Sequence, residues 1–115
     1  MKNFFDTNGN ISSTEIFENV IVGDNLRVER IISHGQTTPP GEWYNQEQDE
    51  WVLVLQGEAR IAYMDGSDIT LCKGEHLFLP RHKKHRISYT STPCLWLAVF
   101  ADKLQFDPDG KFVRV

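Results

Sequence analysis

The sequence predicts an all-β protein, an antiparallel sandwich or barrel of the jelly-roll type, from three observations. Eight short runs of apolar and β-branched residues recur along the 115 residues, at the length and spacing of strands. Turn-forming residues separate these runs, and no stretch keeps a helical period over three turns. Because two packed sheets protect strand edges that would otherwise be exposed, a jelly roll suits this number of strands.

The expected elements follow in order along the chain. Residues 1–14 are rich in Asn, Ser, Thr and Gly, which predicts an irregular N-terminal segment. Residues 15–101 make up the predicted barrel, and residues 102–115 form a C-terminal tail. The strands expected within the barrel are Ile16–Val22, Leu26–Ser33, Trp51–Leu55, Ala59–Met64, Ile69–Cys72, His76–Leu79, His85–Thr90 and Leu95–Phe100.

Turn signals set the boundaries between these strands. Asp65-Gly66 predicts a tight hairpin between the fourth and fifth strands, because such turns need a positive φ that Asp and Gly tolerate. The other boundaries carry Gly, Pro, Asp or Asn, at Gly23-Asp24-Asn25, Pro39-Pro40-Gly41, Lys73-Gly74 and Thr92-Pro93.

The third expected strand is apolar on both faces, which is typical of a strand covered twice. Side chains alternate along a strand, so Glu50, Val52 and Val54 share the face toward the interior. The opposite face carries Trp51, Leu53 and Leu55. Its cover is either the N-terminal segment or a second subunit, and we expect a homodimer because a small isolated barrel would expose Trp51.

The charge balance gives no sign of a nucleic-acid or membrane partner. Lys and Arg total 12 against 16 Asp and Glu, so the net charge is −4 and no global basic field attracts phosphate groups. The length leaves no room for a separate helix-turn-helix reader beside the barrel. One local basic cluster is either a solvated turn or an anion-attracting pocket rim, and it comprises Arg81, Lys83, Lys84 and Arg86.

The two cysteines and the hydropathy pattern predict a cytoplasmic protein. Cys72 and Cys94 lie in apolar runs without CxxC spacing, which favours buried free thiols in a reducing compartment. The first residues contain no apolar stretch typical of a signal peptide. No uncharged apolar run approaches the roughly twenty residues that a membrane span requires.

Two segments carry a recognisable pattern. GEWYNQEQDEWVLVLQG, residues 41–57, resembles the first cupin motif, Gly-x5-His-x-His-x3-Glu-x6-Gly, with Glu50 and Gly57 in register. GEHLFLPRHKKHRISY, residues 74–89, resembles the second motif, Gly-x5-Pro-x-Gly-x2-His-x3-Asn, with Gly74, Pro80 and His85 in register. The chain therefore resembles the cupin superfamily as a small single-domain member, which implies a double-stranded β-helix, or jelly-roll, barrel.

The resemblance also implies a divalent metal, and the chain departs from the usual ligand set. Glu50 and His85 stand where the family supplies an oxygen and a nitrogen ligand, whereas Tyr44 and Gln46 replace its two other histidines. His82 replaces the motif glycine and could complete a two-histidine, one-carboxylate triad, with Gln46 adding an amide oxygen. Such donors suit iron, manganese, nickel or zinc.

Each candidate residue also has a structural interpretation. A buried Glu50 requires a cation, and Arg30 or Arg60 are alternatives to a metal. Asp49 is expected to point away from the interior, to solvent or to a second subunit. The strand that begins at His85 is expected to direct His85, Ile87 and Tyr89 inward, and two tryptophans are candidate pocket walls with N–H donors, Trp43 and Trp96.

Two functions from different classes are compatible with these residues. The first is a small metal-dependent oxygenase, isomerase or lyase acting on an oxygenated metabolite, with Tyr44 or His82 as the proton-transfer group. The second is a non-catalytic cupin that binds or senses a small ligand without a functional metal site. The fold alone does not distinguish them, because one fold supports many activities.

Overall fold

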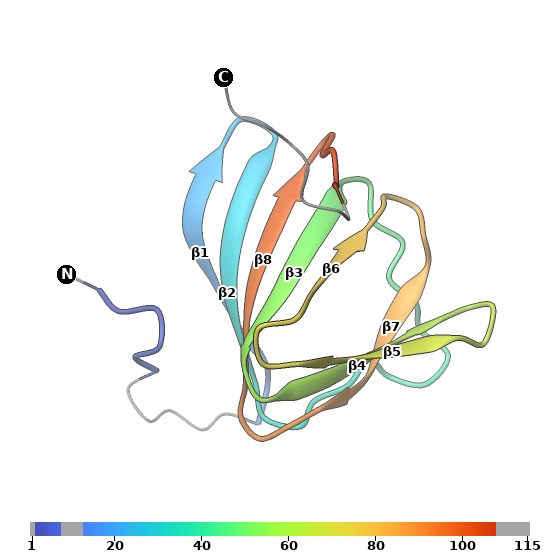
Figure 1. Cartoon of the computed structure of the whole chain (residues 1–115), viewed down its shortest axis with the longest axis horizontal. Coiled ribbons are helices and arrows are strands. Elements are labelled where there is room, and N and C mark those ends of the chain that lie inside the picture. The colour runs from blue at the N-terminus through green and yellow to red at the C-terminus, as the bar shows by residue number, and fades with distance from the viewer. Residues whose placement is uncertain (1, 8–12, 108–115) are drawn as a thin grey trace.

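The computed structural model describes residues 2–7 and 13–107, and this part of the chain contains eight strands and no helix (Figure 1). The strands are β1 (Ile16–Gly23), β2 (Leu26–Ser33), β3 (Asp49–Gln56), β4 (Glu58–Tyr63), β5 (Asp68–Cys72), β6 (His76–Leu79), β7 (His85–Thr90) and β8 (Cys94–Ala101). In the described residues there is therefore no helix that could cross a membrane.

The strands form two antiparallel sheets that face each other, as a jelly roll requires (Figure 1). The larger sheet has the order β1-β2-β8-β3-β6, and the smaller has the order β5-β4-β7. Ladders of hydrogen bonds join strands within each sheet only, so the expected barrel is not closed in the described chain. The result is a two-sheet sandwich that is open between its sheets.

The inward face of β3 confirms the predicted register. Glu50, Val52 and Val54 are 6%, 2% and 0% exposed, and they point between the sheets. The core around them joins side chains of both sheets, among them Ile31, Ala59, Ile61, Leu71, Leu79, Trp96, Ala98 and Phe100. Alternation with period two thus positions a carboxyl group inside an apolar core.

Both chain ends contribute to covering the outer face of the larger sheet: Arg30 of β2 donates to the backbone carbonyls of Phe4 and Asp6, and the C-terminal segment packs near Trp51. Phe106 stacks on Phe78 with the ring centroids 5.5 Å apart. Nearby, the Trp51 indole N–H donates to Nδ1 of His76 at 3.1 Å. These contacts leave Trp51 half-buried.

Asp49 corrects an expectation, because it is 8% exposed instead of solvated. Its carboxylate accepts hydrogen bonds from the backbone N–H groups of Arg81 and Leu104, at 2.8 and 3.0 Å. These two hydrogen bonds lower the pKa of Asp49. The side chain therefore fastens the loop after β6 and the C-terminal segment to β3.

The predicted hairpin is confirmed, whereas the prediction of two buried thiols is correct for only one cysteine. Gly66 has a φ of +91°, and the Tyr63 N–H donates to the Ser67 carbonyl at 2.9 Å, which confirms the tight turn between β4 and β5. Both cysteines are free thiols, as expected. Cys94 is buried, but Cys72 is exposed, so its expected burial is wrong.

Candidate functional site

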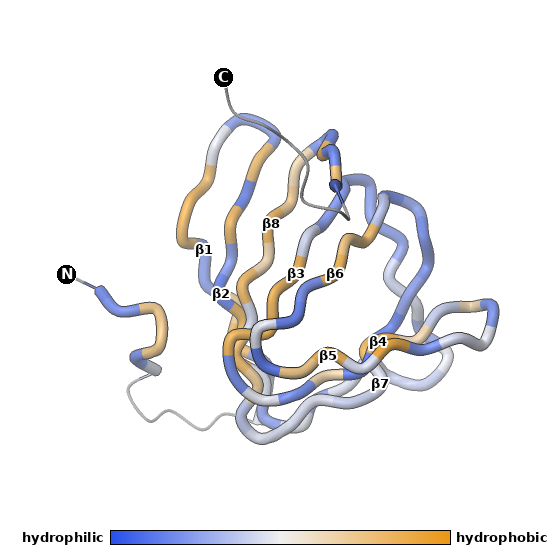
Figure 2. Tube along the Cα trace, in the orientation of Figure 1, coloured by the Kyte–Doolittle hydropathy of each residue, from blue (hydrophilic) through white to orange (hydrophobic). Residues whose placement is uncertain are grey.

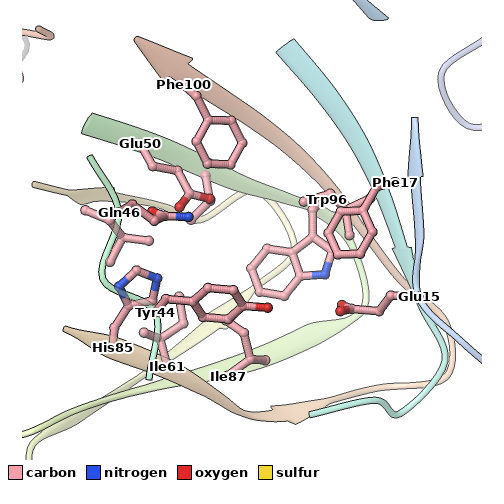
Figure 3. Close-up of a pocket in the computed structure, with 13 residues that line it drawn as sticks. Glu15, Phe17, Tyr44, Gln46, Glu50, Ile61, His85, Ile87, Trp96 and Phe100 are labelled. Atoms are coloured by element: carbon pink, nitrogen blue, oxygen red, sulfur yellow. The ribbon is translucent and has the colours of Figure 1, made fainter. Parts of the chain in front are cut away.

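A pocket opens between the two sheets and has apolar walls with polar groups at two ends (Figure 3). The cavity volume is about 70 Å³, so the pocket is narrow, and it opens to solvent at its mouth. The residues that line it are Glu15, Phe17, Ile31, Tyr44, Gln46, Glu50, Val52, Ile61, Leu79, His85, Ile87, Trp96 and Phe100. No Lys or Arg is among these lining residues.

Glu50 lies at one end of the pocket. Burial disfavours its charged form and raises the pKa from 4.5 to about 7, and a hydrogen bond from the Gln46 side chain opposes this rise only partly. The alternative partners Arg30 and Arg60 lie elsewhere. Arg30 forms an ion pair with Glu18 at 2.7 Å, and the Arg60 side chain donates to the hydroxyl of Thr70.

His85 opens β7 and is 3% exposed. Its Nδ1 lies 3.0 Å from the Lys83 carbonyl oxygen, which can only accept, so Nδ1 carries the proton and Nε2 keeps a free lone pair. Burial lowers the pKa of His85 and favours this neutral ring. Sequence reasoning placed His85 in the pocket, and the structure confirms it.

Tyr44 is held beside His85 by an isolated bridge between the two backbones. The Tyr44 N–H donates to the His85 carbonyl at 2.8 Å, and the rings stack with centroids 5.5 Å apart. Figure 3 shows the Tyr44 hydroxyl directed toward the Glu15 end of the pocket. Burial and nearby carboxylates, Glu15 before Glu50, raise the pKa of Tyr44. The phenol is therefore a hydrogen-bond donor at neutral pH.

His82 is not brought to the other predicted ligands. It is exposed, has a φ of +62°, and its Nδ1 lies 3.1 Å from Oδ1 of Asn45. The cupin motif has glycine at this position, which suits the left-handed backbone. His82 instead contributes its backbone N–H, which donates to the carbonyl oxygen of Gln46 at 2.8 Å and helps to position that residue.

Tyr89 of β7 was expected to point inward but is exposed. The register between β4 and β7 shifts between Arg60 and Ile61, which leaves Ser88 as an extra residue in β7. A bulge of this kind reverses the alternation beyond it. Ile87 therefore lines the pocket, whereas Tyr89 is 41% exposed, and the prediction that it faces the interior is wrong.

The second polar end of the pocket was not found from the sequence. Glu15 lies directly before β1, and its Oε2 accepts a hydrogen bond from the fully buried Ser33 hydroxyl at 2.5 Å. The Trp96 indole N–H donates to the same Ser33 oxygen at 3.1 Å. Trp96 was expected as a wall with an N–H donor and is one, whereas Trp43 is not among the lining residues. No motif marks Glu15, whose place follows from β1 pairing with β2.

The donor set fits a divalent metal only weakly. Among the described residues, no three His, Cys, Asp or Glu side chains are grouped to hold an ion. The pocket offers the Glu50 carboxylate, the Gln46 amide oxygen and the free Nε2 of His85. A tightly held transition metal takes three or four strong ligands, and an amide oxygen is a weak one. These residues could hold an ion of modest affinity.

Solved structures resemble this fold closely. A Ralstonia eutropha protein provisionally named a mannose-6-phosphate isomerase is 38% identical, with a TM-score of 0.84, over 90% of this chain and 98% of that one. A cupin superfamily protein from Desulfitobacterium hafniense has a TM-score of 0.70 at 21% identity, over 82% and 83% of the two chains. A Shewanella frigidimarina protein containing a cupin-2 domain has the same TM-score at 20% identity, over 87% and 93%.

The family follows from both kinds of comparison. The family model described as a cupin domain matches residues 28–100. Together with the Ralstonia relative, this match establishes that the chain belongs to the cupin family. No curated protein matches the chain.

Proposed function

We propose that this cupin binds a small, oxygenated metabolite without negative charge and transfers a proton to or from it, as an isomerase or lyase does. One observation carries the proposal. Glu50, with a pKa of about 7, lies in an apolar pocket with the neutral His85. A carboxyl group near half-protonation at neutral pH can act as base and then as acid within one reaction.

Each polar group at this end of the pocket has a role in the proposal. The Glu50 carboxylate takes a proton from the carbon next to a carbonyl group and returns it to a neighbouring atom. The Gln46 amide hydrogen-bonds to Glu50, and its other N–H can bind the ligand oxygen. The free Nε2 of His85 accepts a hydrogen bond from a ligand hydroxyl, and the surrounding apolar side chains limit access of water.

The charged groups that line the pocket favour a ligand without negative charge. The lining residues include two carboxyl groups and no Lys or Arg. A phosphate group is normally held by Arg, Lys or several backbone N–H groups. A sugar phosphate, which the name of the Ralstonia relative implies for that protein, would therefore meet no Lys or Arg among the residues that line this pocket, although Arg27 stacks over Phe100 nearby.

Deuterium exchange tests the proposed proton transfer. Neutral hydroxycarbonyl compounds, such as dihydroxyacetone and xylulose, are incubated with the protein in D₂O, and loss of the proton next to the carbonyl is followed by NMR. We expect Glu50→Gln to lower the exchange rate by at least about 100-fold, the usual contribution of a general base. The exposed Glu42→Gln is the control and should leave the rate unchanged.

One result of this experiment would support the alternative function instead. If panel members shift the NMR signals of pocket residues but none exchanges its proton faster than in buffer, proton transfer is refuted. The chain would then be a non-catalytic cupin that binds or senses a small ligand.

A divalent metal at Glu50 and His85 is a second candidate, favoured by the geometry of His85. Its Nδ1 proton is donated to a backbone carbonyl, as in many metal-binding histidines, and this leaves Nε2 available. Gln46 would add its amide oxygen. A bound ion would supply Lewis-acid polarisation of a ligand oxygen.

Titration with Mn²⁺ or Zn²⁺ tests this candidate. We expect modest affinity that His85→Ala abolishes and Glu50→Gln weakens strongly, because each removes one of the two strong donors. His82→Ala is the matched histidine control and should bind as the parent does, since His82 is exposed and hydrogen-bonded to Asn45. Equal binding by the parent and His85→Ala would contradict the site.

We also propose that the chain forms a homodimer. The larger sheet ends at β1, whose exposed apolar side chains include Phe17, Val20, Ile21 and Val22. Figure 2 shows an apolar stretch along part of this edge strand. Exposed apolar edges are usually covered in a stable assembly. Light scattering should report twice the chain mass of 13.3 kDa, and a monomer at high micromolar concentration would contradict the proposal.

A further inference from the structure

The Glu15 end of the pocket has the geometry of a built recognition site. Figure 3 shows the Glu15 carboxylate directed into the space between the Tyr44 hydroxyl and the Trp96 ring. The Ser33 hydroxyl holds Oε2, and Ser33 is itself fixed by the indole N–H of Trp96. No other hydrogen bond to this carboxylate is formed within residues 2–7 and 13–107, and Figure 3 shows the carboxylate facing the pocket.

The surroundings of Glu15 favour a cation. Phe17, Tyr44 and Trp96 bring aromatic rings to this end of the pocket, and aromatic faces attract ammonium groups. The lining holds no Lys or Arg that would neutralise the carboxylate. Burial raises the pKa of Glu15, and an ammonium group beside it would lower that pKa again.

We propose that Glu15 is a specificity-determining residue and that the ligand presents to it a protonated amine. This inference rests on the proposed function and extends it. The ligand then has an apolar body, an oxygen function at the Glu50 end and an ammonium group at the Glu15 end. A charge-assisted hydrogen bond is roughly twice as strong as a neutral one, so an amine is preferred over a hydroxyl group of similar size.

Three linear probes with a common hydroxyl end test the inference: aminohexanol, hexanediol and hydroxyhexanoate. Their dissociation constants are measured by NMR titration at about pH 8 and low salt. We expect the parent to bind aminohexanol at least about tenfold more tightly than hexanediol, and hydroxyhexanoate most weakly. Glu15→Gln should reduce the preference for the amine to about twofold or less. The surface control Glu42→Gln should retain it.

A second variant separates the two ends of the pocket. Glu50→Gln leaves Glu15 as the one carboxyl group among the lining residues of the described chain and should keep the preference for the amine. Loss of the preference in Glu50→Gln and its persistence in Glu15→Gln would overturn the inference. Equal binding of aminohexanol and hexanediol by the parent would overturn it too, while leaving the proposed function standing. If none of the three probes binds, the inference fails together with the pocket as a ligand site.

Discussion

Replacing Glu50 by Gln is expected to raise the free energy of unfolding by about 3 kcal/mol at about pH 8. In the folded chain the pKa of Glu50 is about 7, against an ordinary value of 4.5. A tenfold change in proton affinity is worth about 1.4 kcal/mol, so this difference corresponds to about 3 kcal/mol when the carboxyl is fully charged. Gln has nearly the same shape and carries no charge to desolvate.

The direction of the pKa shift of Glu50 determines how the stability difference between the parent and the variant changes with pH. A raised pKa means that the folded state binds the proton more tightly, so the parent loses stability as the pH rises from 4.5 to about 7. Below pH 4.5 the carboxyl is protonated in both states, and the variant should match the parent. Urea unfolding at about pH 4 and pH 8 measures both values, with the exposed Glu42→Gln changing stability by less than about 0.5 kcal/mol.

One result would contradict this prediction. A Glu50→Gln variant that is less stable than the parent at about pH 8 would mean that the carboxylate has a stabilising cation. Repeating the measurement with and without a chelator would then identify whether a metal supplies it, because ligands stabilise only the state that binds them.

Replacing Gly57 by Ala is expected to lower the free energy of unfolding by about 3 kcal/mol. Gly57 joins β3 to β4 with a φ of +87°, a left-handed conformation that costs a residue with a side chain roughly 1–2 kcal/mol. An added Cβ would also collide with the Pro93 carbonyl oxygen and the Ser91 hydroxyl. Overpacking of this kind usually costs about 1–3 kcal/mol.

Gly66 provides the matched control for Gly57. Its φ is +91°, and an added Cβ would meet no atom within 4 Å. Gly66→Ala should therefore lose only the backbone contribution, roughly 1–2 kcal/mol. Denaturant unfolding measures the loss of stability in both variants. If the two losses are equal, the close approach of the residues before β8 does not constrain Gly57.

The fold and one end of the pocket could be predicted because they depend on local periodicity. Alternation along β3 placed Glu50 inside with Val52 and Val54, and the motif spacing placed His85 opposite it. The position of Glu50 follows from a side-chain period of two, which the sequence displays directly, whereas the position of His85 follows from the resemblance to the second cupin motif.

The remaining features depend on long-range pairing or on single turns. The bulge at Ser88 turns Tyr89 outward, and the left-handed turn at His82 keeps that ring out of the pocket. Glu15 reaches the pocket only because β1 pairs with β2, which brings it to Ser33. Asp49 is buried by two distant backbone segments. None of these contacts joins close neighbours in sequence, so no local pattern predicts them.

A buried carboxyl group that lowers stability at neutral pH is typical of a functional site. Core packing alone would favour Gln or an apolar residue at position 50. The same burial that costs folding energy brings the pKa of Glu50 to about 7, where the carboxyl can both give and take a proton. Stability and the proposed activity are thus opposed at this one residue.

NMR titration of the Glu50 side-chain carboxyl carbon tests the central claim most directly. The protein is labelled with ¹³C-glutamate, and Glu50→Gln identifies the signal by its loss. The account predicts a midpoint near pH 7 for Glu50. A Glu50 midpoint near 4.5 would mean that the carboxyl is fully charged at neutral pH, and it would contradict the proposed proton transfer.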